Sequence, residues 1–151
     1  MSKRIFIVYG HHNVKTSFNA AVRDNFIDEA QKNGHEIDLI NLHEEKPLHF
    51  YNGTPPNEQI LDYRKRLELS DVMFMISPCY NLRASAILEN WIDLVLAPKW
   101  FFAFKRVVGN WGYPVAGKMK NKLAIMSMSY GGNIFSIQTW FQNMPFRRIK
   151  A

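Results

Sequence analysis

The stretch RIFIVYGHHNVKTSFNAA, residues 4–21, indicates the fold class because its hydrophobic period changes within a few residues. Residues 4–9 are β-branched, aromatic and almost continuously apolar, which is typical of a strand buried on both faces. From Phe18 onward, apolar residues recur at spacings of three and four, which predicts an amphipathic helix. Its apolar face is predicted to comprise Phe18, Ala21, Val22, Phe26 and Ala30. Residues 10–17, with two histidines, are then the loop that joins strand to helix.

The same alternation continues along the chain. Strands are predicted at residues 36–42, 71–77 and 122–129, and helices at 57–70, 84–97 and about 135–142. Asn33-Gly34 and Pro98 are stop signals for the helices that precede them. A loop is expected at 43–57 and a long aromatic and basic connection at 98–122. Strands that alternate with helices predict βαβ units and a parallel sheet, here in a single α/β domain, residues 1–151.

Charge is distributed unevenly along the 151 residues. The chain has 19 Lys and Arg and 13 Asp and Glu, and every acidic residue lies at or before Asp93. A basic second half indicates either an anionic ligand or partner, or a solvated surface that lacks acids. We expect no nucleic-acid partner, because the sequence contains no helix-turn-helix, zinc-finger or RNP signature.

Targeting signals and disulfides give little information on location. The only cysteine is Cys79, so no internal disulfide can form. No apolar run approaches the roughly 20 residues that span a bilayer, and the N-terminal apolar stretch is too short for a secretory signal. A cytoplasmic location is expected.

Three loops are candidate site segments. Ligands of open parallel sheets bind beyond the carboxyl ends of the strands, which directs attention to residues 10–17, 77–83 and 129–134. The first loop meets a helix start, where free amides favour a phosphate and where Thr16 or Ser17 can cap the helix. Neither GxGxxG nor GK[ST] is present, which argues against a dinucleotide Rossmann site or an NTPase. A capped helix without a ligand is the alternative.

Several segments, in order, resemble the NAD(P)H:quinone oxidoreductase family, which comprises flavoproteins of flavodoxin-like fold. The similar segments are IVYGHHNVKTSFNAA (7–21), LELSDVMFMISP (67–78), AILENWIDLVLAP (86–98) followed by FAFK (102–105), and GYPVAGKMKNKLAIMSMSYGG (112–132).

The resemblance implies an open parallel sheet with helices on both faces. Family members continue into a further helix and a fifth strand, whereas this sequence ends after MPFRRIKA, so at most four parallel strands are expected. Strand 122–129 is then predicted to be an apolar edge. The family also implies a homodimer, with helix 84–97 and the connection 98–114 as interface material.

The resemblance also implies a cofactor and its site. The cofactor is FMN or FAD, NAD(P)H is the co-substrate, the acceptor is quinone-like, and no metal is implied. The flavin phosphate is expected at Ser17, Phe18, Asn19 and one loop histidine. Spacing from Asn19 favours His12, and spacing from the strand favours His11. His12 is preferred, because the helix-side spacing fixes the phosphate site. The other expected flavin contacts are Pro78, Cys79, Tyr80, Asn81, Leu82, Ser129, Tyr130, Gly131 and Gly132, with Tyr130 also a candidate for proton transfer.

The implied activity is hydride transfer from NAD(P)H to a quinone-like acceptor. The alternative is a flavin- or nucleotide-binding regulatory subunit with little turnover, of the kind that associates peripherally with potassium-efflux transporters. The loop PCYNLRAS, residues 78–85, lacks the family's large aromatics, and no Tyr or His follows Tyr130. These two departures, together with the short C-terminus relative to the family, favour the alternative.

Overall fold

The computed structural model describes residues 1–131, apart from the side chain of Ala116. Gly132 and the predicted helix at 135–142 lie outside this range. No helix in the described range is long and apolar enough to cross a membrane. The elements are β1 (Arg4–Tyr9), α1 (Phe18–Lys32), β2 (Glu36–Asn41), α2 (Glu58–Leu69), β3 (Val72–Pro78), α3 (Ala86–Val95), β4 (Phe102–Val108), β5 (Trp111–Ala116) and β6 (Leu123–Ser129).

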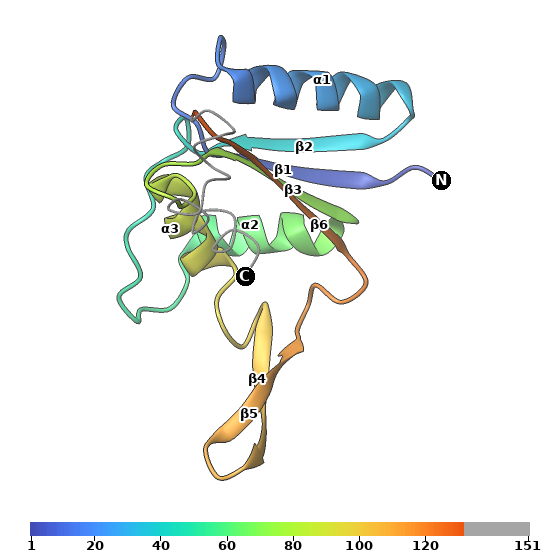
Figure 1. The fold of residues 1–151 in the computed structure, drawn as a ribbon. Coiled ribbons are helices and arrows are strands. Elements are labelled where there is room, and N and C mark those ends of the chain that lie inside the picture. Colours follow the sequence, from blue (N-terminus) through green and yellow to red (C-terminus); the bar gives the residue numbers. More distant parts are fainter. Residues whose placement is uncertain (132–151) are drawn as a thin grey trace, which may run out of the picture.

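The central sheet is parallel and has the strand order β2-β1-β3-β6. Helix α1 covers one face, and α2 and α3 cover the other (Figure 1). This arrangement confirms the predicted open sheet with helices on both faces. Tyr9 is in register with Ile76, and Pro78 is in register with Ser129. The carboxyl ends of β1, β3 and β6 therefore lie at the same edge.

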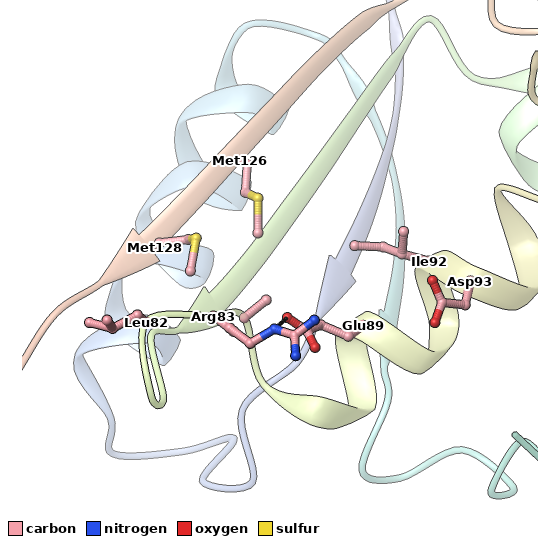
Figure 2. Close-up of a pocket in the computed structure, with 8 residues that line it drawn as sticks. Leu82, Arg83, Glu89, Ile92, Asp93, Met126 and Met128 are labelled. Atoms are coloured by element: carbon pink, nitrogen blue, oxygen red, sulfur yellow. Dashed lines mark ion pairs between the residues drawn. The ribbon is translucent and has the colours of Figure 1, made fainter. Parts of the chain in front are cut away.

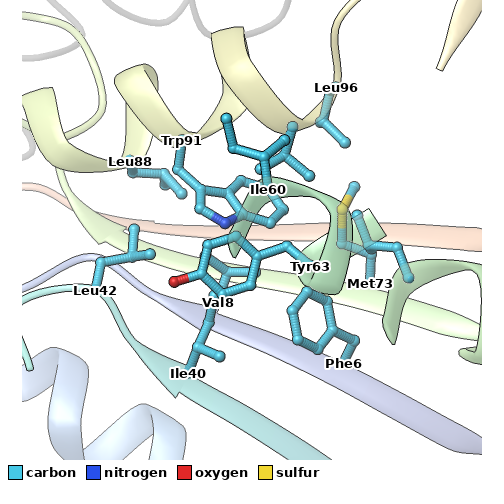
Figure 3. Packing of buried hydrophobic residues seen from close by; sticks show 12 residues of the cluster. Phe6, Val8, Ile40, Leu42, Ile60, Tyr63, Met73, Leu88, Trp91 and Leu96 are labelled. Carbon is cyan, nitrogen blue, oxygen red and sulfur yellow. The ribbon is translucent and has the colours of Figure 1, made fainter. Parts of the chain in front are cut away.

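Two hydrophobic clusters sandwich the sheet because side chains alternate along each strand. In β1, Phe6 and Val8 pack against α2 and α3, whereas Ile7 and Tyr9 face α1. Figure 3 shows the first cluster, in which Trp91 of α3 lies over Phe6 and near Tyr63 of α2. The four β1 side chains and Trp91 are fully buried.

The predicted face of α1 is partly wrong. Phe18 is 72% exposed and Ala21 is also exposed. The buried residues are instead Asn19, Ala20, Arg23 and Ala30. Polar contacts determine this rotation: Asn19 bonds to β6, and Arg23 bonds to the loop below the helix. The predicted end of α1 is confirmed, since Asn33 caps it and Gly34 adopts a φ of 75°.

The region predicted as a connection at 98–122 contains an antiparallel hairpin, β4–β5, which sequence analysis missed. It projects away from the sheet (Figure 1) and exposes Phe104, Val108 and Trp111. Its base is anchored, because the amide of Gly117 donates to the carbonyl of Phe101 at 2.9 Å and Phe101 packs against the core. Pro114 and the neighbouring glycines are typical of loops, which obscured the strand pattern.

Strand β6 pairs with β3 on one side and, within residues 1–131, with no strand on the other. Leu123 and Met126 on this strand are 56% and 43% exposed. The predicted apolar edge is therefore present in the described part of the sheet.

Candidate functional site

Hydrogen bonds bring the three candidate loops together at the carboxyl ends of β1, β3 and β6. The Asn19 side-chain amide donates to Ser129 Oγ at 2.7 Å, which joins the start of α1 to the end of β6. The Cys79 amide donates to the Ser129 carbonyl at 2.8 Å, so Ser129 links all three segments. Asn19 is only 3% exposed, and its Oδ1 has no partner in the described structure. An orphaned polar atom of this kind is compatible with a polar ligand.

A second set of bonds joins β1 to the start of α3. Ser85 Oγ donates to the Gly10 carbonyl at 2.6 Å, and the Ser85 amide donates to Ser77 Oγ at 2.9 Å. Ser77 and Ser85 are buried. A Cβ at Gly10 would lie 2.9 Å from Ser85 Oγ, which explains why the strand leaves the sheet at a glycine. The loops are therefore positioned by buried polar contacts.

The loop at residues 10–17 is organised by its own side chains. Ser17 caps α1, because its Oγ accepts from the Ala20 amide at 3.0 Å; of the two predicted caps, Ser17 is the one used. Asn13 Oδ1 accepts from the amides of Lys15 and Thr16 at 3.1 and 2.9 Å. Since Ser17 takes up the Ala20 amide, the start of α1 leaves the amides of Phe18 and Asn19 as donors to an anion.

The two loop histidines have different roles in the geometry. His11 is half-buried, and its Nδ1 accepts from the Asn13 amide at 2.9 Å, so His11 helps to build the loop. His12 is exposed and stacks on His11 with 4.4 Å between ring centroids. His43, after β2, meets the His12 ring edge-on at 6.3 Å. Among residues 1–131, no three His, Cys, Asp or Glu side chains are grouped as a metal site.

Protonation of this histidine cluster is expected to destabilise the protein. Burial and the neighbouring His12 lower the pKa values of His11 and His43 below the ordinary 6.5. The unfolded chain therefore binds protons at higher pH than the folded chain. The free energy of unfolding falls as the pH drops from about 6.5 through the lower folded pKa values.

Urea unfolding at several pH values between about 7 and about 5 measures this loss. His43→Gln is expected to give a shallower pH dependence than the wild type, and His49→Gln, in the exposed loop after β2, is the control. Parallel pH profiles for all three proteins would contradict the prediction.

The second loop contains a tight turn from Tyr80 to Arg83. Each of these two residues donates its amide to the carbonyl of the other, at 2.9 and 3.0 Å. Between them, Asn81 and Leu82 have φ values of 50° and 66°. Asn tolerates the left-handed region, whereas a bulky Leu there is an uncommon and strained choice. Such strain is concentrated at functional sites, where surrounding contacts maintain it.

The other predicted ring-side residues surround this turn. Pro78 is buried, Tyr80 is 48% exposed, and Cys79 is half-buried. Burial raises the pKa of the Cys79 thiol, which keeps it protonated and weakly nucleophilic. In the third loop Tyr130 is half-buried and Gly131 is exposed; the prediction for Gly132 lies outside the described residues.

A cavity of about 750 Å³ adjoins the turn, between α3 and the β6 edge (Figure 2). Leu82 belongs to the turn and also lines the cavity, and Met126 and Met128 of β6 form part of the cavity wall. Arg83 forms an ion pair with Glu89 of α3 at 3.2 Å. The cavity therefore has a largely apolar strand wall and a charged helix wall.

Sequence analysis missed Arg23, which is 8% exposed and contacts the first loop. A signal was available, because Ala20, Arg23, Ile27 and Ala30 follow a spacing of three and four along α1. The charge of Arg23 led to its omission from the buried stripe, since arginine is rarely buried without partners.

Comparison with known proteins identifies the family. A protein family described as having a flavodoxin-like fold matches residues 3–149 of this chain. The chain belongs to this flavodoxin-like family.

The sequence relatives of the chain have the names of redox enzymes. A ribosyldihydronicotinamide dehydrogenase [quinone] from Pongo abelii is 24% identical over 155 residues, 86% of this chain and 64% of the relative. The chain thus spans less than two thirds of the length of that relative. An FMN-dependent NADH:quinone oxidoreductase from Burkholderia lata is 29% identical, over 85% of this chain and 70% of the relative.

Solved structures confirm the flavodoxin-like fold. A protein from Klebsiella pneumoniae, provisionally assigned as a quinone reductase, superposes with a TM-score of 0.81 at 22% identity. The match covers 98% of this chain and 67% of that protein.

Proposed function

We propose that this protein is a flavin-dependent oxidoreductase that binds FMN and transfers hydride from NAD(P)H to a quinone-like acceptor. The observation that carries the proposal is the convergence of three loops at Ser129, which contacts Asn19 and Cys79. The names of the two sequence relatives, both quinone-reducing dehydrogenases or oxidoreductases, support this activity. FMN is proposed over FAD because one of these relatives is named as FMN-dependent.

The phosphate end of FMN fits the start of α1. There the helix dipole and first-turn amides attract an anion, and the exposed side chains of His12 and Lys15 offer N–H donors. Among the described residues, the unpartnered atom of the buried Asn19 side chain is its acceptor oxygen, Oδ1, which suits a hydroxyl donor of the ligand next to the phosphate. We propose that Ser17, Phe18, Asn19 and His12 hold this end. Ser17 acts by capping the helix, and Phe18 acts through its backbone because its ring is exposed.

The ring end is proposed to lie against Pro78, Cys79, Tyr80, Asn81 and Leu82, with Ser129, Tyr130, Gly131 and Gly132 on the other side. Bound FMN supplies a carrier that accepts and releases hydride. The protein's part is to orient the ring against the strained turn and to exclude water from the reacting face. Tyr130 is proposed to supply a proton to the acceptor from its hydroxyl.

We also propose a homodimer and a cytoplasmic location. The dimer is supported by the projecting β4–β5 hairpin, whose exposed Phe104, Val108 and Trp111 form apolar surface of the kind that partner subunits cover. The cytoplasm contains NAD(P)H, the proposed hydride donor, so this location suits the proposed activity.

The test of function is a visible spectrum of the protein after FMN is added and unbound FMN is removed. Retained flavin bands that bleach with anaerobic NADH or NADPH and return with menadione would support the oxidoreductase. Retained bands that do not bleach would contradict the oxidoreductase proposal and favour a flavin-binding or regulatory subunit. A colourless protein would overturn flavin binding, and retention of FAD but not FMN would correct the cofactor.

The proposed contact of Asn19 with FMN is tested by substitution. Asn19→Leu is expected to weaken FMN binding about tenfold or more, because it removes a buried polar contact. Asn25→Leu on the same helix is the matched control, since Asn25 is exposed and bonds only to the Ala21 carbonyl among described atoms. Fluorescence titration measures both. Equal effects would contradict the assignment.

The choice of histidine is tested in the same titration. His12→Ala is expected to weaken FMN binding more than His11→Ala. The reverse order would make His11 the flavin-side histidine.

A further inference from the structure

Arg23 is a buried cation directly beneath the first loop. Its Nη2 donates to the Val14 carbonyl at 2.8 Å, and its Nη1 donates to Asn41 Oδ1 at 3.2 Å. Its Nε donates to Asp24 Oδ1 at 2.7 Å, and Asp24 is 54% exposed. Each nitrogen of the guanidinium therefore has a partner, and two of these partners lie outside α1.

A second path connects Arg23 to the loop through Tyr9. The guanidinium lies over the Tyr9 ring, 4.6 Å from its centroid. The Tyr9 hydroxyl donates to the Asn13 carbonyl at 2.8 Å and lies 2.9 Å from Ser17 Oγ, the cap of α1. Arg23 thus supports both the middle of the loop and its junction with the helix.

These contacts determine which loop groups face outward. Because the carbonyls of Val14 and Asn13 are bonded to buried groups, they are held toward the protein interior. A carbonyl turned toward the outer face would repel an anion there, whereas the amides at the helix start attract one. The guanidinium charge itself is paired with Asp24, so Arg23 favours the anion through the loop geometry that it holds.

We propose that Arg23 is a positioning residue that shapes the loop at 10–17 for a phosphate monoester without touching it. The inference rests on the proposed function, in which that phosphate is the end of FMN. Arginine is suited to this role because its planar fork holds several acceptors in fixed directions, which a lysine cannot do.

The test compares FMN with riboflavin, which lacks the phosphate, in Arg23→Met and Arg23→Lys. FMN affinity is expected to fall about tenfold or more in Arg23→Met and by less in Arg23→Lys, which keeps the charge. Riboflavin affinity is expected to stay unchanged. Equal losses for both flavins, or no loss for either, would overturn the proposal.

Arg66→Met is the matched control. Arg66 on α2 is half-buried, pairs with Asp38 and lies 5.0 Å from the Phe6 ring centroid, so like Arg23 it has an acidic and an aromatic partner. It lies on the opposite face of the sheet from α1. Its loss is expected to lower Tm without changing the ratio of FMN to riboflavin affinity. A changed ratio in this control would show that general destabilisation accounts for the effect, which would overturn the proposal.

Inorganic phosphate separates this inference from the proposed function. Phosphate at constant ionic strength is expected to raise the Tm of the wild type and of Arg66→Met but not that of Arg23→Met. If this pattern holds and no flavin binds, the phosphate-positioning role stands and the flavin function fails. If phosphate raises the Tm of Arg23→Met as much as that of the wild type, the positioning role fails. If neither phosphate nor flavin binds the wild type, both fail.

Discussion

Trp91→Ala is expected to lower the free energy of unfolding by about 3–5 kcal/mol, the usual range for removing a buried tryptophan. Trp91 is fully buried, and its ring centroid lies 6.3 Å from that of Phe6 and 6.2 Å from that of Tyr63. It therefore joins α3, the sheet and α2 (Figure 3). Its loss leaves a cavity where three elements meet. Since domains are stable by only about 5–15 kcal/mol, this variant is expected to be marginal.

Urea unfolding followed by far-UV circular dichroism measures the effect without relying on tryptophan fluorescence. Phe50→Ala is the control, because Phe50 is 81% exposed in the loop between β2 and α2, away from the proposed dimer surface. It is expected to cost less than about 1 kcal/mol. Similar losses in the two variants would show that the cluster around Trp91 is not the main core.

Trp91→Phe refines the same prediction. The indole Nε1 is buried and has no hydrogen-bond partner within the described residues. Phenylalanine leaves a smaller cavity than alanine and removes the unpaired donor, so the loss is expected to be much smaller.

Gly10→Val is expected to cost about 3 kcal/mol, at the upper end of the usual range for overpacking. A Cβ at this position would lie 2.9 Å from Ser85 Oγ and 3.0 Å from Leu88 Cβ. Ser85 cannot rotate away freely, because it bonds both to the Gly10 carbonyl and to Ser77. The strand end and the start of α3 must therefore separate, which also disturbs the candidate site.

A double-mutant cycle tests this steric explanation. Gly10→Ala combined with Ser85→Ala is expected to cost less than the sum of the single changes, because the second substitution removes the clashing oxygen. Chemical unfolding of the four proteins gives the coupling. Strict additivity would show that Gly10 is required for another reason.

Apart from the β4–β5 hairpin, the element order and the site region could be predicted from sequence, because both depend on hydrophobic period and on the carboxyl-end rule for parallel strands. Strand β1 and the end of α1 at Asn33-Gly34 are clear cases. The rotation of α1 could not be predicted from sequence. It depends on the bonds of Asn19 to Ser129 and of Arg23 to Val14, which are tertiary contacts. A polar residue that is buried with partners is not distinguishable by composition from one that faces solvent.

Within the site, the sequence indicated which loops meet but not which contacts each side chain makes. Spacing from the helix favours His12 and spacing from the strand favours His11, whereas the structure distinguishes them by the bond from the Asn13 amide to His11 and by the exposure of His12. The left-handed turn at Asn81 and Leu82 was also hidden, because leucine is not a turn residue by preference.

The strand order has a consequence for synthesis on the ribosome. Strands β2, β1 and β3 lie within the first 78 residues and can pair as soon as they emerge, whereas β6, the partner of the other side of β3, begins at Leu123. At roughly 5–20 residues per second, the free edge of β3 waits several seconds for β6. During that interval an apolar strand edge is open to other nascent chains, so the yield of folded protein is expected to depend on translation rate and on chaperones that cover such edges.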